Sequence, residues 1–270
     1  MRSLRAHRSS FQRRITRAVS LVLCFDYDGT VSPITDHPSR ARLPASTKRL
    51  LKRLIGLPRL WVALVSGRAL HDLKRMVGIR DLYYVGNHGF ELEGPNLRYV
   101  NPIARATRPL LRRIAGELKA ALQPIPGAWV EEKGLTLSIH WRNVPESARR
   151  RFRRLVAQSL APHLKQRSIR VTEGKRVIEI RPPVPWDKGE VILWLCSRLR
   201  GCCEGREPLV VYFGDDRTDE DAFRAVNRLR GISVLVGRPT RRSAARYWLK
   251  DPREVHTWLV ELSRVRRGRG

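Results

Sequence analysis

Hydrophobic residues in this chain form short runs, each ending at turn-forming residues, and segments with helical spacing lie between them. The apolar runs lie at residues 19–25, 60–65, 82–85, 209–213 and 232–236. Runs of this length are typical of strands that are buried on both faces of a parallel sheet. Apolar residues recur at helical spacing in 46–55, 69–76, 188–198 and 219–230. The alternation of strands and helices predicts a doubly wound α/β sheet.

The middle of the chain has a different pattern. Two long helical segments are each followed by a pair of short strand-like segments, with turn residues between the two members of a pair. The helices are expected at 104–122 and 146–160, and the pairs at 129–132 with 136–141 and 169–171 with 176–181. The sequence therefore predicts a parallel-sheet core made of residues 19–103 and 184–262. A smaller α+β domain, residues 104–183, is inserted between the two halves.

Composition adds a strong positive charge to this picture. Of the 270 residues, 54 are Lys or Arg and 25 are Asp or Glu, so the formal charge is +29 and the pI is near 11.4. Six arginines lie in a basic N-terminal tail, 1–18, and four more near the end of the chain, where 263–270 forms a basic C-terminal tail. We expect the N-terminal stretch to be a disordered tail or a transit peptide. Neither tail has the interleaved aromatic residues of a single-strand nucleic-acid surface.

Several classes of protein can be excluded or disfavoured. No apolar run approaches the roughly 18 residues that a membrane span needs, so we expect no membrane partner. The four cysteines form no C-x-x-C pair, and two of them are adjacent, which favours reduced thiols in a cytoplasmic protein. Because the positive charge is spread along the chain, we interpret it as solvated surface and do not expect nucleic acid as a partner.

Acidic residues follow two of the predicted strands. Asp26 and Asp28 end the first run, and Asp215 and Asp216 follow the fourth. Ligands of open α/β sheets bind outside the carboxyl ends of the strands, where these side chains would converge. A bare cluster of carboxylates repels itself, and an all-oxygen ligand set favours a hard cation such as Mg²⁺. Helix caps and turns are the alternative explanation, and for Asp219, at a predicted helix start, the two are equally favoured.

These residue types suit phosphoryl transfer. A carboxylate beside Mg²⁺ can attack phosphorus, and a second carboxylate two residues further on can protonate the leaving oxygen and then activate water. The phosphoryl oxygens also need hydrogen-bond donors and positive charge. Ser66, at the end of the second predicted strand, and Lys188, at the start of a predicted helix, can supply them.

Four segments resemble the motifs of haloacid-dehalogenase-like phosphatases: FDYDGT at 25–30, VSGR at 65–68, Lys188-Gly189, and GDDRTDEDAF at 214–223. Three more resemble the trehalose-6-phosphate phosphatases within that superfamily: GNHGFE at 86–91, EEKGLTLSIHWR at 131–142 and GKRVIEIRP at 174–182. The resemblance extends over 21–262. It implies a Rossmann-like core, with the inserted α+β domain as a cap.

The resemblance also implies roles for individual residues. Asp26 would be the nucleophile and Asp28 the general acid and base, with Lys188 and Ser66 binding the phosphoryl group. Mg²⁺ would be held by Asp26, by Asp28 through its backbone carbonyl, and by Asp215, with Asp216 and Asp219 in support. The remaining residues expected near the phosphate or the substrate are Thr30, Gly67, Arg68 and Asn87.

In the cap, the resemblance matches Glu131, Lys133 and Glu179 to positions that hydrogen-bond the distal glucose, with His140 and Arg142 close by. Recognition of a neutral, polyhydroxylated sugar requires paired donors and acceptors, and alternation places Glu131 and Lys133 on one face of a strand. The alternatives are a solvent-facing ion pair, and a core histidine at position 140.

The expectation is a Mg²⁺-dependent phosphatase that converts trehalose 6-phosphate to trehalose and phosphate, acting on a small-molecule sugar phosphate without an obligate protein partner. A related capped phosphatase that acts on sucrose 6-phosphate or a glycosyl phosphoglycerate is the first alternative. A basic nucleic-acid-binding protein on a phosphatase scaffold is the second.

Overall fold

The chain forms two compact units. The computed structural model describes residues 1–35, 41–174, 176–203, 206–239 and 242–267. One unit contains Met1–Arg98 and Trp186–Gly270, and the other is the inserted segment Tyr99–Pro185. The predicted insertion, 104–183, lies within this second unit.

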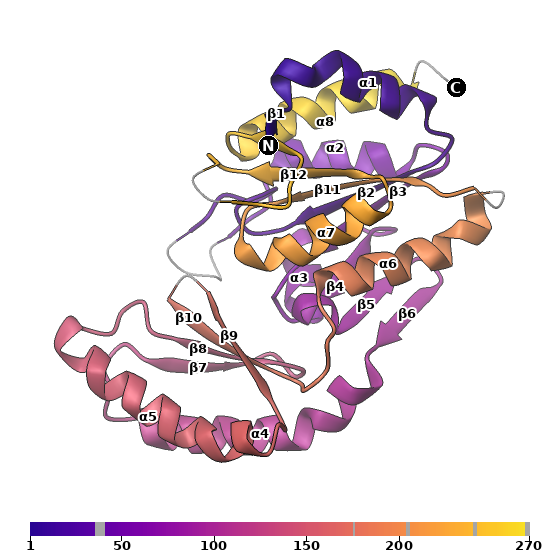
Figure 1. Ribbon diagram of the computed structural model, residues 1–270. Coiled ribbons are helices and arrows are strands. Elements are labelled where there is room, and N and C mark those ends of the chain that lie inside the picture. Colours follow the sequence, from indigo (N-terminus) through magenta and orange to yellow (C-terminus); the bar gives the residue numbers. More distant parts are fainter. Residues whose placement is uncertain (36–40, 175, 204–205, 240–241, 268–270) are drawn as a thin grey trace. The chain divides into compact units, whose positions relative to one another are not determined.

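The first unit is built on a nine-stranded sheet (Figure 1). The strand order is β1 (Arg2–Ser3), β13 (Tyr247–Leu249), β12 (Ile232–Val236), β11 (Leu209–Gly214), β2 (Leu21–Asp26), β3 (Leu60–Val65), β4 (Tyr83–Gly86), β5 (Glu91–Gly94) and β6 (Leu97–Val100). Neighbouring strands are parallel from β1 to β4, and β5 is antiparallel to β4. This topology confirms the predicted α/β fold.

Helices cover both faces of this sheet (Figure 1). On one face lie α1 (Arg8–Arg17), α2 (Ala45–Ile55) and α8 (Pro252–Arg267), and on the other lie α6 (Lys188–Leu199) and α7 (Glu220–Arg228), while α3 (Leu70–Val77) packs beside β4. All six residues of β2 are buried, and Phe25 stacks on Phe213 of the neighbouring strand at a centroid distance of 5.0 Å. Burial of each large apolar side chain contributes about 1.5–3 kcal/mol, so the central strands hold the unit together.

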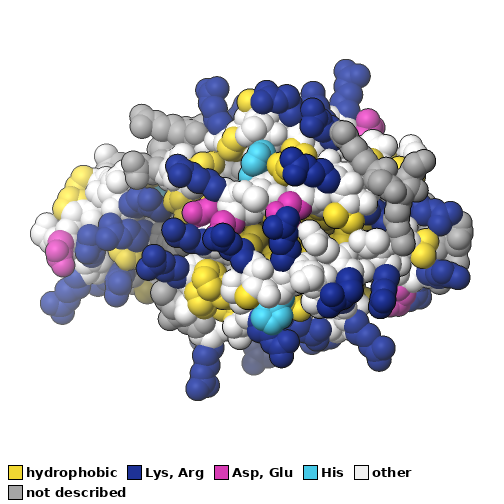
Figure 2. Space-filling view, turned by 90° about the horizontal axis from the view of Figure 1, so that it is seen from above, with side chains coloured by type: hydrophobic (Ala, Val, Ile, Leu, Met, Phe, Trp, Pro, Cys, Tyr) yellow, Lys and Arg dark blue, Asp and Glu magenta, His cyan; other side chains and the backbone are white. Residues whose placement is uncertain are grey.

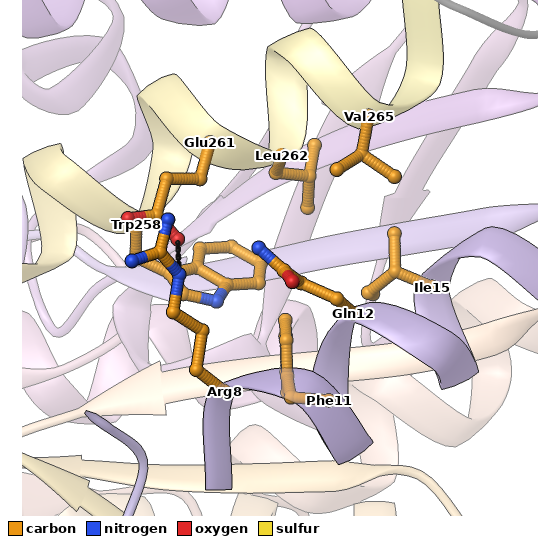
Figure 3. A pocket seen from close by; sticks show the side chains of 8 residues that line it. All are labelled: Arg8, Phe11, Gln12, Ile15, Trp258, Glu261, Leu262 and Val265. Carbon is orange, nitrogen blue, oxygen red and sulfur yellow. Dashed lines mark ion pairs between the residues drawn. The ribbon is translucent and has the colours of Figure 1, made fainter. Parts of the chain in front are cut away.

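The N-terminal segment is not a tail in this structure. Strand β1 extends the sheet beside β13, and α1 packs on α8 with Phe11 and Ile15 buried. Phe11 meets Trp258 edge to face at 4.7 Å, and Arg8 pairs with Glu261 at 2.9 Å beside a small pocket between the two helices (Figure 3). At the other end, α8 extends to residue 267, so most of the predicted C-terminal tail is helical, and 268–270 lie outside the described residues.

The inserted unit has two layers. Its antiparallel sheet has the order β7 (Trp129–Glu132), β8 (Leu137–His140), β10 (Val177–Arg181) and β9 (Arg170–Gly174). The helices α4 (Pro102–Leu122) and α5 (Glu146–Lys165) form a core with Leu137, Ile139 and Ile180 of the sheet. Because side chains alternate along a strand, Glu131, Ser138, His140 and Glu179 share the opposite face, whereas Glu132 faces the helices and pairs with Lys119 of α4. The register places both Glu131 and Glu179 opposite Ser138.

Basic side chains are distributed over the surface. Lys and Arg side chains stand out across the whole face that is seen in Figure 2, with acidic and histidine side chains between them. This distribution is that of a solvated, highly charged surface. None of the described helices is both long enough and apolar enough to span a lipid bilayer.

Candidate active site

Polar residues gather at the carboxyl ends of the parallel strands. Strand β2 ends at Asp26, β11 ends just before Asp215, β3 just before Ser66, and β4 just before Asn87. The parallel registers align these ends along one edge of the sheet. Carboxylate oxygens of Asp26, Asp215 and Asp219 lie within 4.8 Å of one another. The two acidic segments that the sequence places after different strands therefore meet in the structure.

Lys188 lies inside this acidic group. Its side chain is 3% exposed, and Nζ donates to Asp26 Oδ1 at 2.6 Å and to Asp219 Oδ1 at 2.7 Å. The lysine is the first residue of α6, whose N-terminus is capped by the Asp187 carboxylate through the N–H groups of Gly189 and Glu190. The cap fixes where the helix begins and so aims the side chain. Lys188 is a buried, doubly paired cation and not one of the solvated lysines.

Burial and neighbouring charges shift the pKa values of this pair. Burial raises the pKa of Asp26, the Lys188 charge opposes that rise, and the nearby acids Asp219, Asp215 and Asp28 add to it. Burial alone would lower the pKa of Lys188, but the Asp219 and Asp26 carboxylates outweigh burial and hold it above its ordinary value. The site thus contains more carboxylate groups than the single positive charge of Lys188 can neutralise. A further positive charge would stabilise the ionised form of Asp26.

Asp219 is more central than the sequence indicates. It is fully buried, and three donors surround its carboxylate. Oδ1 accepts from Lys188 and from the Tyr212 hydroxyl, both at 2.7 Å, and Oδ2 accepts from the Asp216 N–H at 2.9 Å. Gly214 is required because a Cβ there would overlap the Asp219 carboxylate. Asp219 was expected as a helix cap or in support of the metal. Its bond to the Asp216 N–H is part of a capping box, whereas Lys188 and Tyr212 lie in other elements and could not be read from the local sequence.

The predicted metal ligands can be compared with the acidic side chains that lie together. Among the described residues, the carboxylates close enough to share one cation belong to Asp26, Asp215 and Asp219. Asp28 was predicted to act through its backbone carbonyl, and its carboxylate is held by Arg68, with Nε to Oδ2 at 2.7 Å and an Nη to Oδ1 at 2.6 Å. Two parallel charged hydrogen bonds fix the orientation of a carboxylate strongly. Arg68, which was expected near the substrate, therefore aligns Asp28 in this structure.

Backbone hydrogen bonds link the loop after β3 to the turn after β4. Asn87 and His88 both have left-handed backbone conformations, with φ of 48° and 58°. Their N–H groups donate to the carbonyls of Arg68 at 2.7 Å and of Ser66 at 2.9 Å. Two successive left-handed non-glycine residues cost conformational energy, which the surrounding structure must offset. The hydrogen bonds that these two residues make hold the loop after β3 in one position.

Glu91 and His88 complete this link. The Glu91 carboxylate accepts from the Asn87 amide at 2.6 Å and from the Leu70 N–H at 2.9 Å. A Cβ at Gly67 would overlap the ring of His88, so glycine is needed for the close approach of the loop and the ring. Both Glu91 and His88 lie in the GNHGFE segment but were not identified as site residues. The signal was present, because polar residues follow directly after a buried strand.

The turn after β2 contains a buried hydroxyl. Thr30 is 0% exposed, and its Oγ1 has no hydrogen-bond partner among the described residues. An unsatisfied buried hydroxyl is costly, and an anionic ligand would satisfy it. Ser66 lies at the end of the next strand, is also buried, and its Oγ accepts the Arg68 N–H at 3.2 Å. Thr30 and Ser66 are hydroxyls of the type that phosphate-binding loops use.

Gly29 provides a direct test of this geometry. Its φ is +84°, and a Cβ on it would overlap the Asp215 carboxylate. We expect Gly29→Ala to displace Asp215 and to lower the phosphatase activity predicted from the sequence about 100-fold, because misplacement by about 1 Å has effects of that size. The measurement is the rate of phosphate release together with the Mg²⁺ concentration at half-maximal rate, which should rise.

The matched control is Gly78→Ala. Gly78 also has a positive φ, +57°, but ends α3, and the nearest atom to its Cβ would be the flexible Lys48 Nζ at 3.3 Å. This variant has the backbone strain without the clash, and full activity is expected. Equal losses in both variants would contradict the assignment of the Gly29 effect to Asp215.

A second polar cluster lies on the sheet of the inserted unit. Glu179 Oε1 accepts from Lys133 Nζ at 3.1 Å and from Ser138 Oγ at 2.7 Å, while Glu131 Oε2 pairs with His140 Nε2 at 2.8 Å. Lys133 also lies 4.0 Å from Glu131. Burial raises the pKa of Glu131, but the His140 hydrogen bond and the Lys133 charge outweigh burial and hold it below its usual value. The structure thus brings together four residues that were predicted from the sequence, Glu131, Lys133, His140 and Glu179.

Two further residues complete the description of this cluster. Arg142, also predicted here, is exposed and does not belong to the hydrogen-bonded group in the described structure. Trp129 was not predicted, and it stacks on His140 at a centroid distance of 3.9 Å and an angle of 8°. His140 is therefore a partner of Glu131 and Trp129 and not an isolated core histidine.

The fold and the core site together define the class of this protein. A parallel α/β sheet has carboxylates at the ends of the adjacent strands β2 and β11, and a lysine at a helix start contacts them. With the inserted α+β unit, this is the haloacid-dehalogenase-like fold. The model of the trehalose-phosphatase family matches residues 24–253, and the chain belongs to this family.

Individual relatives agree with this assignment. The chain is 39% identical over 250 residues to the trehalose-phosphate phosphatase of Mycobacterium leprae, a match that covers 89% of this chain and 57% of that protein. It is 34% identical over 253 residues to trehalose-phosphate phosphatase B of Arabidopsis thaliana, covering 90% and 66%. The chain thus spans less than two thirds of the length of these relatives.

Among solved structures, the C-terminal domain of trehalose-6-phosphate phosphatase from Candida albicans has a similar fold. The TM-score is 0.82 at 23% identity, and the match covers 97% of this chain and 98% of that one.

Proposed function

We propose that this protein is a Mg²⁺-dependent phosphatase that hydrolyses trehalose 6-phosphate to trehalose and phosphate through an aspartyl phosphate. The observation that carries the proposal is the buried contact of Lys188 with Asp26 and Asp219, with Asp215 beside them. Membership of the trehalose-phosphatase family supports the choice of substrate.

In the first step, a carboxylate oxygen of Asp26 attacks phosphorus, and the bond from phosphorus to the sugar oxygen breaks. Asp28 gives its proton to that oxygen as it leaves. Asp28 then takes a proton from water, which attacks the phosphorus of the aspartyl phosphate and releases inorganic phosphate and the free Asp26 carboxylate. The paired hydrogen bonds from Arg68 keep the Asp28 carboxyl group in one orientation.

Three side chains would bind the transferring phosphoryl group. Lys188 supplies fixed positive charge next to the nucleophile, and its two carboxylate partners keep it charged. The buried hydroxyls of Thr30 and Ser66 supply donors. Donors held in place before the reaction stabilise the charge that develops in the transition state without a cost of reorganisation.

The core site also fits a divalent cation. Asp26, Asp215 and Asp219 offer carboxylate oxygens within 4.8 Å of one another, an all-oxygen set of the kind that Mg²⁺ prefers. Because Asp219 already accepts three hydrogen bonds, we assign Asp26 and Asp215 as the side chains that would hold the ion. When bound, Mg²⁺ would lower the repulsion between these acids and the phosphoryl oxygens.

We assign recognition of the sugar to Glu131, Lys133 and Glu179. Their side chains form a connected array of donors and acceptors on one face of a sheet. A sugar hydroxyl both donates and accepts, so an array of carboxylates around an ammonium can pair with several hydroxyls at once. Sugars that lack one hydroxyl would leave one of these groups unpaired and bind more weakly.

The experiment that tests the proposal is phosphate release from a panel of sugar phosphates, with Mg²⁺ and with a chelator. We expect strong preference for trehalose 6-phosphate over sucrose 6-phosphate, glucosyl phosphoglycerate and glucose 6-phosphate, and loss of activity with the chelator. Comparable rates on several sugar phosphates would contradict the assigned substrate and retain the core chemistry. No release from any ester would contradict the proposal as a whole.

The cap assignment predicts a selective defect in Glu179→Gln. The amide keeps the shape of the side chain but loses the charge that Lys133 and Ser138 contact. A hydrogen bond to a charged group contributes about 1.5–3 kcal/mol, so KM for trehalose 6-phosphate should rise about 10- to 100-fold. The kinetics of p-nitrophenyl phosphate, which has no sugar, should not change.

Glu173→Gln is the matched control for this variant. Glu173 lies on the neighbouring strand β9, opposite Ile178, and is exposed. The variant makes the same chemical change on the same sheet and should leave KM for trehalose 6-phosphate and KM for p-nitrophenyl phosphate unaltered. A rise in KM for both substrates of Glu179→Gln would assign the residue to the stability of the fold and not to the sugar.

A further inference from the structure

Tyr212 is a buried polar residue for which neither the sequence motifs nor the proposed mechanism has a role. It lies in β11, two residues before Gly214, and its side chain is fully buried. The hydroxyl lies 2.7 Å from Asp219 Oδ1. A carboxylate can only accept a hydrogen bond, so the tyrosine is the donor.

This hydroxyl is part of a continuous chain of contacts that ends at the proposed nucleophile. Tyr212 donates to Asp219 Oδ1, Lys188 donates to the same oxygen at 2.7 Å, and Lys188 also donates to Asp26 Oδ1 at 2.6 Å. The position of one carboxylate oxygen therefore determines where the ammonium lies relative to Asp26. Whatever fixes Asp219 Oδ1 also fixes Lys188.

The other contacts of Asp219 hold Oδ1 less directly. The Asp216 N–H bonds to Oδ2 and only limits how far the planar carboxylate can turn, and the Lys188 ammonium is at the end of a long side chain with four rotatable bonds. Tyr212 differs from both. Its ring is rigid, lies in a central strand of the sheet, and packs edge to face against Phe223 of α7 at 5.7 Å.

We propose that Tyr212 is a positioning residue for phosphoryl transfer, which holds Asp219 Oδ1 in place and through it keeps the Lys188 ammonium next to Asp26. The inference rests on the proposed function. Without the hydroxyl, the Asp219 carboxylate, held then by the Asp216 N–H on Oδ2, can turn further about its side-chain bond, and Lys188 moves with it. The phosphoryl group then meets a displaced charge in the transition state, while the binding of the sugar is not affected.

The test compares Tyr212→Phe with Tyr84→Phe. Tyr84 is a matched control because it is also a buried tyrosine of the same unit, and within the described part of the chain its hydroxyl bonds only to the backbone of Ile79, at 2.7 and 3.0 Å. Each variant removes one buried hydroxyl and keeps the ring. The measurements are kcat and KM for trehalose 6-phosphate and for p-nitrophenyl phosphate, together with the melting temperature.

For Tyr212→Phe we expect kcat to fall about tenfold on both substrates, the effect of one lost hydrogen bond, with KM within about twofold. Tyr84→Phe should lower the melting temperature at least as much and leave kcat unchanged. An unchanged kcat in Tyr212→Phe would overturn the inference. So would equal falls of kcat in both variants, because these would show a general effect of destabilisation.

A second variant pair tests the route through Asp219. We expect Tyr212→Phe to have little further effect in an Asp219→Asn background, since the carboxylate that it positions is then absent. If the falls of kcat in Tyr212→Phe and in Asp219→Asn multiply fully in the double variant, Tyr212 does not act through Asp219 and the inference is overturned. Wild-type protein that hydrolyses no phosphate ester would instead reject the proposed function and the inference with it, whereas active wild type with a fully active Tyr212→Phe rejects the inference alone.

Discussion

Asp26→Asn is expected to lower kcat by about 10⁴-fold or more, the scale seen when covalent catalysis loses its nucleophile. The amide has the shape of the carboxylate but cannot attack phosphorus. A trapped aspartyl phosphate, detectable after acid quench of wild-type protein with labelled substrate, should be absent from the variant. Full turnover by Asp26→Asn with normal Mg²⁺ dependence would contradict the mechanism.

This variant should fold normally. Burial raises the pKa of Asp26, with further contributions from neighbouring acids, so the site disfavours the charged form and accepts a neutral amide. Lys188 keeps its second partner, Asp219. We expect no loss of stability against urea. Asp72→Asn, at an exposed ion pair on α3, is the control and should have wild-type kinetics.

Lys188→Met is expected to have the second-largest effect, on activity and on stability together. Removal of the charge that faces the phosphoryl group should lower kcat about 10²- to 10³-fold, as for loss of one electrostatic donor. The change also leaves the Asp26 and Asp219 carboxylates buried without their counter-charge. Breaking a buried ion pair by removing one partner costs about 3–5 kcal/mol.

Urea unfolding in the absence of divalent cations measures the second effect. Lys74→Met is the matched control, because Lys74 pairs with Glu93 while both side chains are more than a third exposed. Exposed pairs contribute about 0–1 kcal/mol, so this variant should unfold close to wild type and retain full activity. Equal stability of Lys188→Met and wild-type protein would show that the buried cluster does not stabilise the fold.

The strands of the core and the acids at their ends could be predicted because they depend on local pattern. An apolar run that ends in Asp26 or before Asp215 can be recognised without knowledge of the rest of the chain. The partners of these side chains could not be predicted in the same way. Asp219 is explained by a lysine 31 residues before it and by a tyrosine on the preceding strand, and neither spacing is a local signal.

The N-terminal segment shows how composition can conceal a helix. Phe11 and Ile15 are four residues apart and share the buried face of α1, but six arginines surround them in the first twenty residues. Few residues of this segment are apolar, and its helix is stabilised by packing on α8, which lies more than 200 residues further on. Because the helix depends on this distant packing, the local sequence pattern alone predicted a tail.

In the polar cluster on the sheet of the inserted unit, Glu131, Lys133, His140 and Glu179 were predicted, but their pairing was not. Alternation placed Glu131 on one face of a strand, whereas its bond to His140 and the stack of His140 on Trp129 depend on the register of β7 and β8. Register is set by turn geometry and by which face is apolar. A shift of one residue would turn Glu131 toward the helices.

The short strand β1 has a consequence for solubility. It covers the edge of β13, and its own outer edge is only two residues long. An exposed row of free N–H and C=O groups allows strands of other molecules to add to a sheet, and very short edge strands offer too few of them. The inner strands β12, β11, β2 and β3 are apolar and parallel, so β1 protects this edge of the sheet, beside β13, from edge-to-edge aggregation.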